Sequence, residues 1–515
     1  MRRSLPSFVA DPEAPREWRT RIVLFGLWLA LVAWFCATHV FWRDEVRAFS
    51  LALSGSSYAE MLGNVHGEGH PALWYLILRG AHQLFPYREV LPVAGALIGI
   101  AAMAVLTFFS PFRTIIIVAI LFSFYGAFEY VAIARNYGIS ALVMFAIAAL
   151  NPRIRGTLWL GVVVALLCNT NVPSCILAAA FMLFRFVEML TEESKPTRRD
   201  WLVFVGNSAL AAIGAYLCFR MVYPTFNDAA VSPHLQHITP GSVIHALIDS
   251  EWGFSHLGFN GFLPLPMDAI LLAIACLGLI RRPAALAAAI AGLVALKLFF
   301  YFVYFSYYRH EILYLIFLIS LYWMVAEDAG GRWRKEPAFD RLQLVGAAVF
   351  VAILMFQCGR LIGPLRAQVS GVPFSRSADV GALLRRPELA GAIVMGDPDT
   401  MLEPVRYYAD NPIWFLRQQR FGNVVRLARN ARHELSLIDI LADAQRLHQQ
   451  TGRPVVFLSH IELQARREEK KRVMFRDATI LRPAEVERFW ASTRLVAKLR
   501  PSDSDEEYDV YVYPR

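Results

Sequence analysis

The sequence predicts a polytopic α-helical membrane protein with a C-terminal soluble α/β domain, and three observations carry this prediction. The 515 residues are 56% hydrophobic and only 18% charged, with a mean hydropathy of +0.42, which is far too apolar for a soluble globular protein. Apolar runs recur from residue 22 to residue 358. Beyond that point the composition changes, since residues 359–515 hold 45 of the 93 charged residues.

The chain therefore divides into an N-terminal segment (1–21), a transmembrane domain (22–358) and a soluble domain (359–515). The first apolar run, Ile22 to Val40, exceeds a signal-peptide core of ~7–15 residues, so we expect an uncleaved first membrane helix. Several later runs are shorter than the ~20 residues of a comfortable span. The eleven runs lie near residues 22–41, 90–110, 114–128, 137–150, 157–171, 172–190, 201–223, 264–280, 284–304, 311–326 and 342–358.

Basic residues in the connections predict the orientation. A further apolar segment, His70 to Phe85, is interrupted by Arg79 and His82. If it does not span, all the basic connections lie on the side of the N-terminus, which the positive-inside rule makes cytoplasmic. We therefore predict an amphipathic helix in the outer interface. The basic connections contain residues 1–21, Arg113, Arg153, Arg155, Lys195, Arg198, Arg199, Arg281, Arg282, Arg332, Arg334 and Lys335.

This topology places the C-terminal domain outside, together with the outer loops 42–89 and 129–136. Within that domain, residues 391–397, 453–460 and 507–513 have strand composition, and helical patterns run near 400–409, 413–430 and 436–450. The turn Gly396–Asp399 after the first of these strands is a candidate ligand site, although such a turn is usually only a turn.

Two acidic residues follow the first predicted span. The segment FWRDEVRAF places Asp44 and Glu45 just beyond the helix, where aromatic residues mark the membrane interface. Adjacent residues on a helix point about 100° apart, so only one of the two carboxylates can readily face a given pocket. The pair can equally be a solvated helix start with favourably placed charges.

A second polar cluster, His66-Gly-Glu68-Gly-His70, lies later in the same loop. The two glycines permit an irregular backbone, so that the three polar side chains can converge on a polar substrate or a divalent metal ion. The spacing matches no standard zinc motif. A polar site without metal is therefore favoured, with Glu68 and His70 as the candidate ligands if a metal binds.

Two further clusters place arginines at the outer ends of apolar runs. FEYVAIARNYG contains Glu129, Arg135 and Tyr137, and YFVYFSYYRHEILY contains Arg309 and His310. Ionisable residues at membrane depth are costly and usually face a polar cavity, where an arginine can hold a phosphate through paired hydrogen bonds. The alternatives are an ion pair between Glu129 and Arg135 and an interfacial anchor at Arg309.

Taken in this order, the pieces resemble the GT-C membrane glycosyltransferases, in the branch of protein O-mannosyltransferases, aminoarabinose transferases and rhizobial galacturonosyltransferases. The resemblance covers residues 20–330 well and the tail only in kind, and it implies a GT-C fold of about 11 transmembrane helices. Two departures are His70-Pro71-Ala72, where many relatives have a double proline, and Glu129, where relatives often have aspartate. The matching pieces are Asp44-Glu45, HPALWYL, ARNYG, YYRHEILY and the outer C-terminal domain.

The resemblance implies an enzyme that transfers a sugar from a polyprenyl-phosphate donor to an acceptor hydroxyl on the periplasmic face of the bacterial inner membrane, usually with inversion. The acceptor class is an envelope lipid, polysaccharide such as lipopolysaccharide, or protein. Asp44 would be the general base that takes the hydroxyl proton. The amphipathic segment 70–85 would wall a groove for the prenyl chain.

The resemblance also distributes the remaining polar residues between donor and acceptor. Stabilisation of the leaving phosphate falls to arginines rather than to an acid, because a phosphate needs little protonation. The donor-phosphate residues would be Arg135, Arg309, His310 and Tyr137. The acceptor or metal side would be formed by Glu45, His66, Glu68 and His70.

Two other functions stay open. A lipid-linked glycan polymerase or ligase would share the polytopic body and the arginines but would not obviously need Asp44. A lipid or solute transporter would use Arg135 and Glu129 in a substrate pathway, although transporters commonly show repeated halves and this sequence has none. The net charge of +9 comes with both signs interspersed in the tail. The predicted partners are therefore donor, acceptor and lipid bilayer, and no nucleic acid.

Overall fold

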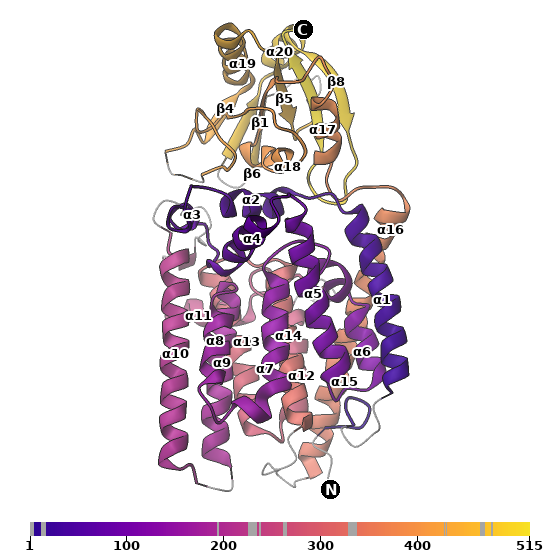
Figure 1. The fold of residues 1–515 in the computed structure, drawn as a ribbon, viewed down its shortest axis with the longest axis vertical. Coiled ribbons are helices and arrows are strands. Elements are labelled where there is room, and N and C mark those ends of the chain that lie inside the picture. The colour runs from indigo at the N-terminus through magenta and orange to yellow at the C-terminus, as the bar shows by residue number, and fades with distance from the viewer. Residues whose placement is uncertain are drawn as a thin grey trace.

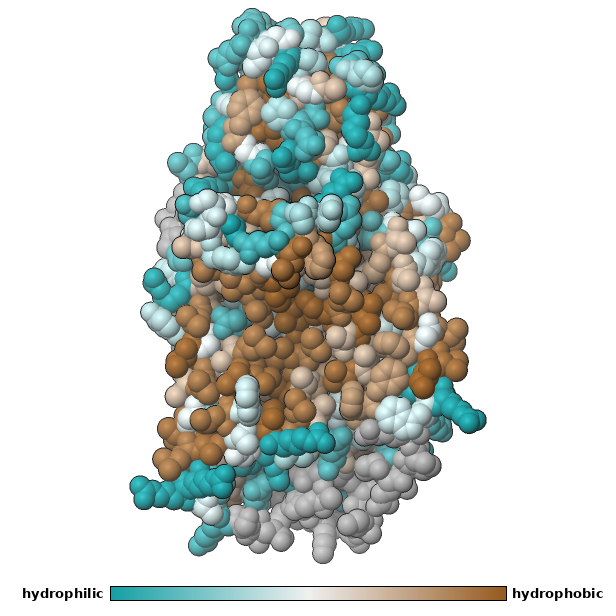
Figure 2. Space-filling model, in the orientation of Figure 1, coloured by the Kyte–Doolittle hydropathy of each residue, from teal (hydrophilic) through white to brown (hydrophobic). Residues whose placement is uncertain are grey.

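In the computed structural model, the chain forms a helical bundle with a smaller α/β domain at one end (Figure 1). On the face seen in Figure 2, a band of hydrophobic side chains covers the bundle between two more hydrophilic ends, which is the surface that a bilayer requires. The predicted fold class is therefore confirmed. Arg332, Arg334 and Lys335 of the predicted basic connections lie outside the described residues. The structure describes residues 5–11, 17–192, 195–224, 234–235, 238–260, 265–327, 337–426, 428, 430–463, 469–474 and 477–515.

All eleven predicted apolar runs fold as helical segments, and eight of these described helices are long and apolar enough to cross a membrane. The remaining three runs form shorter segments. The eight are α1 (Trp18–Thr38), α5 (Val90–Phe109), α7 (Tyr137–Ile154), α9 (Val172–Thr191), α10 (Arg198–Val222), α13 (Pro283–Phe302), α14 (Tyr308–Glu327) and α15 (Pro337–Arg360). The shorter ones are α6 (Thr114–Leu121) with the π-helix η1 (Tyr125–Glu129), α8 (Trp159–Cys168), and α12 (Met267–Cys276) with the 3-10 helix η3 (Leu277–Leu279).

The centre of the bundle is α14, of which 94% of the most apolar window is buried. Its sequence is apolar on all sides below the first turn, as expected for a helix surrounded by other helices. The polar residues Arg309 and His310 belong to that first turn. The fold therefore brings them to the middle of the bundle at one end.

Three short helices of the first outer loop cross this end of the bundle beneath the C-terminal domain (Figure 1). They are α2 (Arg43–Ala52), α3 (Tyr58–Val65) and α4 (Leu73–Leu84). At 12 residues α4 is too short to span a bilayer. Its buried Arg79 donates to the carbonyl oxygens of Ala52 and Ser54 at 3.1 and 2.9 Å, so the charge that interrupts this apolar segment caps the end of α2.

The C-terminal domain follows α16 (Ile362–Val369) and contains two sheets. The larger has the order β3-β2-β1-β5-β9-β8, with β1, β2 and β5 parallel, and the smaller has the order β4-β7-β6. Helices cover both faces of the larger sheet, α17 and α18 on one and α19 and α20 on the other. The bounds are α17 (Ser377–Leu384), β1 (Ile393–Asp397), η4 (Asp399–Leu402), α18 (Val405–Tyr408), β2 (Ile413–Phe415), β3 (Arg420–Phe421), β4 (Glu434–Ser436), α19 (Leu437–Thr451), β5 (Val455–Ser459), β6 (Lys470–Met474), β7 (Asp477–Leu481), α20 (Pro483–Ser492), β8 (Arg494–Leu499) and β9 (Tyr508–Tyr513).

The three predicted strands are confirmed as β1, β5 and β9, which are neighbours in the sheet. The helix expected at 413–430 is wrong. Its first residues, Ile413 to Phe415, are a fully buried β-prone run that pairs in parallel with β1 and turns back as β3. The helix expected at 400–409 is split into η4 and α18, with Pro404 immediately before α18.

Candidate active site

Asp44 lies in the first turn of α2, at the end of the bundle that the C-terminal domain covers (Figure 1). Its Oδ2 atom accepts hydrogen bonds from Arg135 and, at 3.2 Å, from Nη2 of Arg309. Among the described residues, none donates a hydrogen bond to Oδ1, and the side chain is 28% exposed. One carboxylate oxygen is therefore free to take a proton from an incoming group.

The loop between η1 and α7 positions the arginines on either side of Asp44. Within it, the backbone N–H of Ala134 donates to Glu45 at 2.7 Å, which ties the loop to α2. The hydroxyl of Tyr130 donates to the backbone oxygen of Arg309 at 2.7 Å, which ties the same loop to the start of α14. Three segments far apart in sequence thus converge on one carboxylate.

The electrostatics of this group favour a permanent carboxylate and an additional anion. Burial by itself raises the pKa of Asp44, but the charges of Arg135, Arg309 and Arg43 outweigh it and hold the pKa well below its usual range. Asp44 with Arg135 and Arg309 forms what we call the Asp44 cluster, which carries two positive charges and one negative charge. The cluster therefore has the charge to bind an additional anion.

Aromatic rings hold the two guanidinium groups in place and leave some of their donors unused. Arg309 lies over Trp42 and Tyr307, 5.3 and 5.1 Å from the ring centroids, and Arg135 lies 5.6 Å from the centroid of Tyr137. Nε of Arg309 and the hydroxyl of Tyr137 are buried and have no hydrogen-bond partner in the described part of the chain. Both are donors that a phosphate oxygen can satisfy.

The two histidines lie beside this cluster. Nε2 of His70 is 3.4 Å from Nη2 of Arg135. Burial and the charge of Arg135 lower the pKa of His70 to about 3, which keeps its ring neutral. His310 accepts the backbone N–H of Tyr307 at 2.9 Å, and its ring packs edge-on against Tyr137. His310 therefore packs against aromatic residues rather than against Asp44.

Glu45 points away from Asp44, as expected for neighbours on a helix. It is fully buried and bonds Nε2 of His39 at 2.8 Å and the backbone N–H of Trp42 at 3.2 Å, besides that of Ala134. The bond to Trp42 is half of a capping box at the start of α2. Its contacts fix the arrangement of the loops and leave it with no open face.

The predicted cluster of His66, Glu68 and His70 is divided by the fold. Gly67 and Gly69 adopt φ angles of 82° and 84°, so the irregular backbone expected from the glycines is present. Glu68 binds Arg47, with Nε of Arg47 at 3.1 Å, whereas His70 faces the Asp44 cluster. Among the described residues, no group of three or more histidine, cysteine, aspartate or glutamate side chains is arranged to hold a metal ion.

In the predicted cluster of Glu129, Arg135 and Tyr137, the contacts also differ from the ion pair considered as an alternative. Among the described residues, Glu129 forms no ion pair with Arg135, whose guanidinium binds Asp44 instead. Asn136 donates to the backbone oxygen of Thr170 at 2.6 Å and so fixes the loop to the α8–α9 connection.

No role was predicted from the sequence for Arg43 and Arg47, which join α2 to the C-terminal domain. Nη1 of Arg43 donates to Asp505 at 2.7 Å, and its backbone N–H donates to Glu506 at 2.7 Å. Arg47 binds Glu403 as well as Glu68. The i, i+4 spacing of the two arginines indicates one shared face of α2, but their partners in the C-terminal domain lie more than 350 residues away and have no signal in the sequence.

Comparison with known proteins gives structural likenesses only. No family model matches the chain, and no match is found among curated proteins. ArnT from Cupriavidus metallidurans bound to undecaprenyl phosphate is 13% identical, with 97% of this chain and 98% of that chain covered at a TM-score of 0.49. The same protein in the apo state is 14% identical, with 96% and 97% covered at 0.48.

Proposed function

We propose that the protein is a glycosyltransferase of the bacterial inner membrane that moves a sugar from a polyprenyl-phosphate donor to a hydroxyl of an envelope lipid, polysaccharide or protein. The observation that supports it is the Asp44 cluster: a partly exposed carboxylate bound by two arginines, with Nε of Arg309 left without a partner among the described residues. A base and an anion site in contact are what displacement of a phosphate by a hydroxyl requires.

The proposed step is a single displacement. The acceptor oxygen forms a bond to the anomeric carbon as the bond from that carbon to the phosphate oxygen breaks, and the electron pair leaves with polyprenyl phosphate. The acceptor proton passes to Oδ1 of Asp44. Arg135 and Arg309 stabilise the charge that develops on the leaving phosphate, and attack from the opposite side inverts the anomeric centre.

Donor binding activates the base in this scheme. In the free protein both arginines bind Oδ2 of Asp44, which makes it a weak base. A phosphate between the arginines competes for the same guanidinium groups and neutralises part of their charge. The pKa of Asp44 then rises towards its ordinary value of about 3.9, so that the carboxylate becomes more basic when the donor is present.

The topology in this proposal follows from the basic connections. With residues 1–21 in the cytoplasm, the end of the bundle that carries α2 and the C-terminal domain faces the periplasm.

A metal ion is not needed for the proposed displacement, because the arginines supply the positive charge.

The test is mass spectrometry of envelope glycans from a deletion strain that carries the wild-type gene or Asp44→Asn at matched protein levels. Asparagine keeps the shape of the side chain and loses its basicity, so we expect the transferred sugar to fall by about 10²–10⁴-fold. The mass that returns with wild type identifies the sugar class.

Asp410→Asn is the matched control, because Asp410 is a fully exposed carboxylate of the C-terminal domain and its loss should leave transfer unchanged. Equal restoration by wild type and Asp44→Asn would exclude Asp44 as the base and favour the polymerase, ligase or transporter alternatives.

A further inference from the structure

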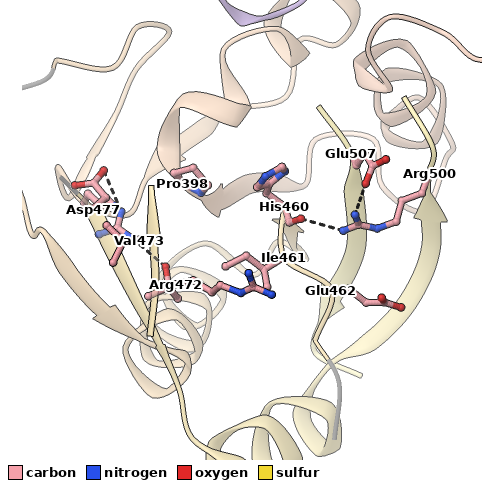
Figure 3. Close-up of a pocket in the computed structure, with 11 residues that line it drawn as sticks. Pro398, His460, Ile461, Glu462, Arg472, Val473, Asp477, Arg500 and Glu507 are labelled. Carbon is pink, nitrogen blue, oxygen red and sulfur yellow. Dashed lines mark hydrogen bonds and ion pairs between the residues drawn. The ribbon is translucent and has the colours of Figure 1, made fainter. Parts of the chain in front are cut away.

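The C-terminal domain contains a cavity of 490 Å³ at the carboxyl ends of β1 and β5 (Figure 3). The chain leaves β1 over one face of the sheet to β2 and reaches β5, on the other side of β1, after crossing the opposite face in α19. Neighbouring strands whose connections leave in opposite directions create the crevice in which α/β sheets bind ligands. Pro398, in the turn that the sequence singled out, lines this cavity.

Two arginines in the walls bind carboxylates and backbone oxygens of the surrounding loops. Arg417 donates to Asp397 at 2.6 Å and to the backbone oxygen of Arg432 at 3.0 Å. Arg500 binds Glu507 and donates to the backbone oxygen of His460 at 3.0 Å (Figure 3). These contacts hold the loops after β1 and β5 apart.

Two other polar groups line the cavity, and each has a polar atom that lacks a partner among the described residues. Arg472 on β6 lies opposite Thr479 of β7, and both residues line the cavity. Within the described residues the guanidinium of Arg472 has no ion-pair partner. Nδ1 of His460 is buried without a hydrogen-bond partner in the same part of the chain, and burial lowers the pKa of His460, which keeps the ring neutral.

These groups define the chemistry of a ligand. A free guanidinium selects a phosphate or carboxylate, while an unpartnered imidazole nitrogen and the carboxylates of Asp477 and Glu507 at the walls suit hydroxyl groups. The volume lies in the range of about 300–1,000 Å³ typical of small-molecule sites. Among the described lining residues, His460 has the only aromatic ring.

One segment connects the cavity with the start of α2. Arg500 and Glu507 line the cavity, and Asp505 and Glu506 between them bind Arg43, the residue before Asp44. We propose that this cavity binds an anionic sugar residue, one bearing a phosphate or a carboxylate, of the acceptor glycan. The identity of the ligand as acceptor rests on the proposed function; the binding of an anionic sugar does not.

The test is isothermal titration calorimetry on the full-length protein in lipid nanodiscs with four probes: glucose 6-phosphate, glucuronate, glucose and inorganic phosphate. At least one anionic sugar should bind at least tenfold more tightly than both glucose and inorganic phosphate, and the tighter of the two identifies the acidic group. Arg472→Gln should weaken that binding at least tenfold. Lys471→Gln is the control, since its side chain points to the other face of β6 and pairs with Glu434 at 2.7 Å.

Binding of inorganic phosphate as tightly as the best sugar, or no binding of either anionic sugar, would overturn the proposal. So would an unchanged affinity in Arg472→Gln. These outcomes are separate from those of Asp44→Asn: loss of transfer in that variant with no sugar binding here removes only the cavity proposal, whereas sugar binding with intact transfer removes only the proposed base.

Discussion

Two arginine–carboxylate groups include residues of α2, and they differ in stoichiometry and exposure. The Asp44 cluster has two arginines for one carboxylate, and Asp44 is 28% exposed. The second group, which we call the Arg47 cluster, has one arginine for two carboxylates, Glu68 and Glu403, whose side chains are only 4% and 2% exposed. The same chemistry therefore builds a partly exposed site with excess positive charge around Asp44 and a closed joint around Arg47.

The difference indicates different roles. A joint between domains should have every group satisfied, and Glu403 also accepts the backbone N–H of Val425 at 2.8 Å. A reacting site needs unsatisfied groups, such as Nε of Arg309. The helix that carries the proposed base is thus fixed from above by the C-terminal domain and left open below towards the arginines of the bundle.

The largest effect that distinguishes the clusters is expected at Arg309. Arg309→Gln removes charge from the position of the leaving phosphate, and we expect kcat for sugar transfer to fall by about 10²–10³-fold, as for loss of one donor to a developing anion. Arg309→Lys should recover part of the rate because it restores the charge without the planar fork. Transfer measured on purified protein checks both. An unchanged rate in Arg309→Gln would contradict the assignment of a phosphate to this group.

At Arg47 we expect a loss of stability rather than a loss of transfer rate. Arg47→Met leaves Glu68 and Glu403 buried without their cation, and breaking a buried pair in this way costs about 3–5 kcal/mol. We expect a lower thermal midpoint in detergent and faster proteolysis between the bundle and the C-terminal domain. Arg482→Gln is the control, because it removes an exposed arginine from ion pairs that contribute little. A wild-type midpoint in Arg47→Met would show that the joint does not hold the domain.

Much of the Asp44 cluster could be predicted from the sequence, and little of the Arg47 cluster. Asp44, Arg135 and Arg309 each stand at the end of an apolar run, so hydropathy and the sidedness of the loops bring them to the same end of the bundle. Glu68 stood in a conspicuous His-Gly-Glu-Gly-His motif, yet its partner is Arg47 and not the neighbouring histidines. That pairing depends on how α2 packs beneath the C-terminal domain, which no local pattern encodes.

The same limit applies within the C-terminal domain. Strands β1, β5 and β9 were recognisable because each is a continuous or alternating apolar segment. The run Ile413 to Phe415 is equally apolar, but three residues cannot distinguish strand from helix by periodicity, and its pairing with β1 decided the outcome. The cavity beside Pro398 depends on this pairing, so only its turn could be singled out in advance.

A smaller effect is expected in the pH dependence of transfer, which depends on the Asp44 cluster. If donor phosphate competes with Asp44 for the arginines, the pKa of Asp44 is lower in the free protein than in the donor complex. The acidic limb of kcat/KM, which reports the free protein, should then lie below that of kcat at saturating donor. Rate profiles between pH 3 and pH 8 test this, with Arg309→Lys as the comparison. Coincident limbs would mean that donor binding does not change the surroundings of the base.

The smallest effect concerns the pH dependence of stability that arises from the Arg47 cluster. Burial raises the pKa of Glu403 to about 7, more than the charge of Arg47 lowers it. A carboxyl group whose pKa is raised in the folded protein contributes stability below its ordinary value of about 4.3, and this contribution is lost as the pH rises through about 7. The thermal midpoint should therefore fall by a few degrees between pH 5 and pH 8.

Glu403→Gln should flatten this dependence, since an amide cannot lose a proton, and Glu485→Gln should not, because Glu485 pairs with an exposed arginine at the far side of the domain. Burial also raises the pKa of Glu506, to about 8, beside Arg43, so the slope that remains in Glu403→Gln should decrease further in the double variant with Glu506→Gln. A midpoint that instead rises with pH would mean that both carboxylates are ionised in the joint and that Arg47 and Arg43 outweigh the cost of burying them.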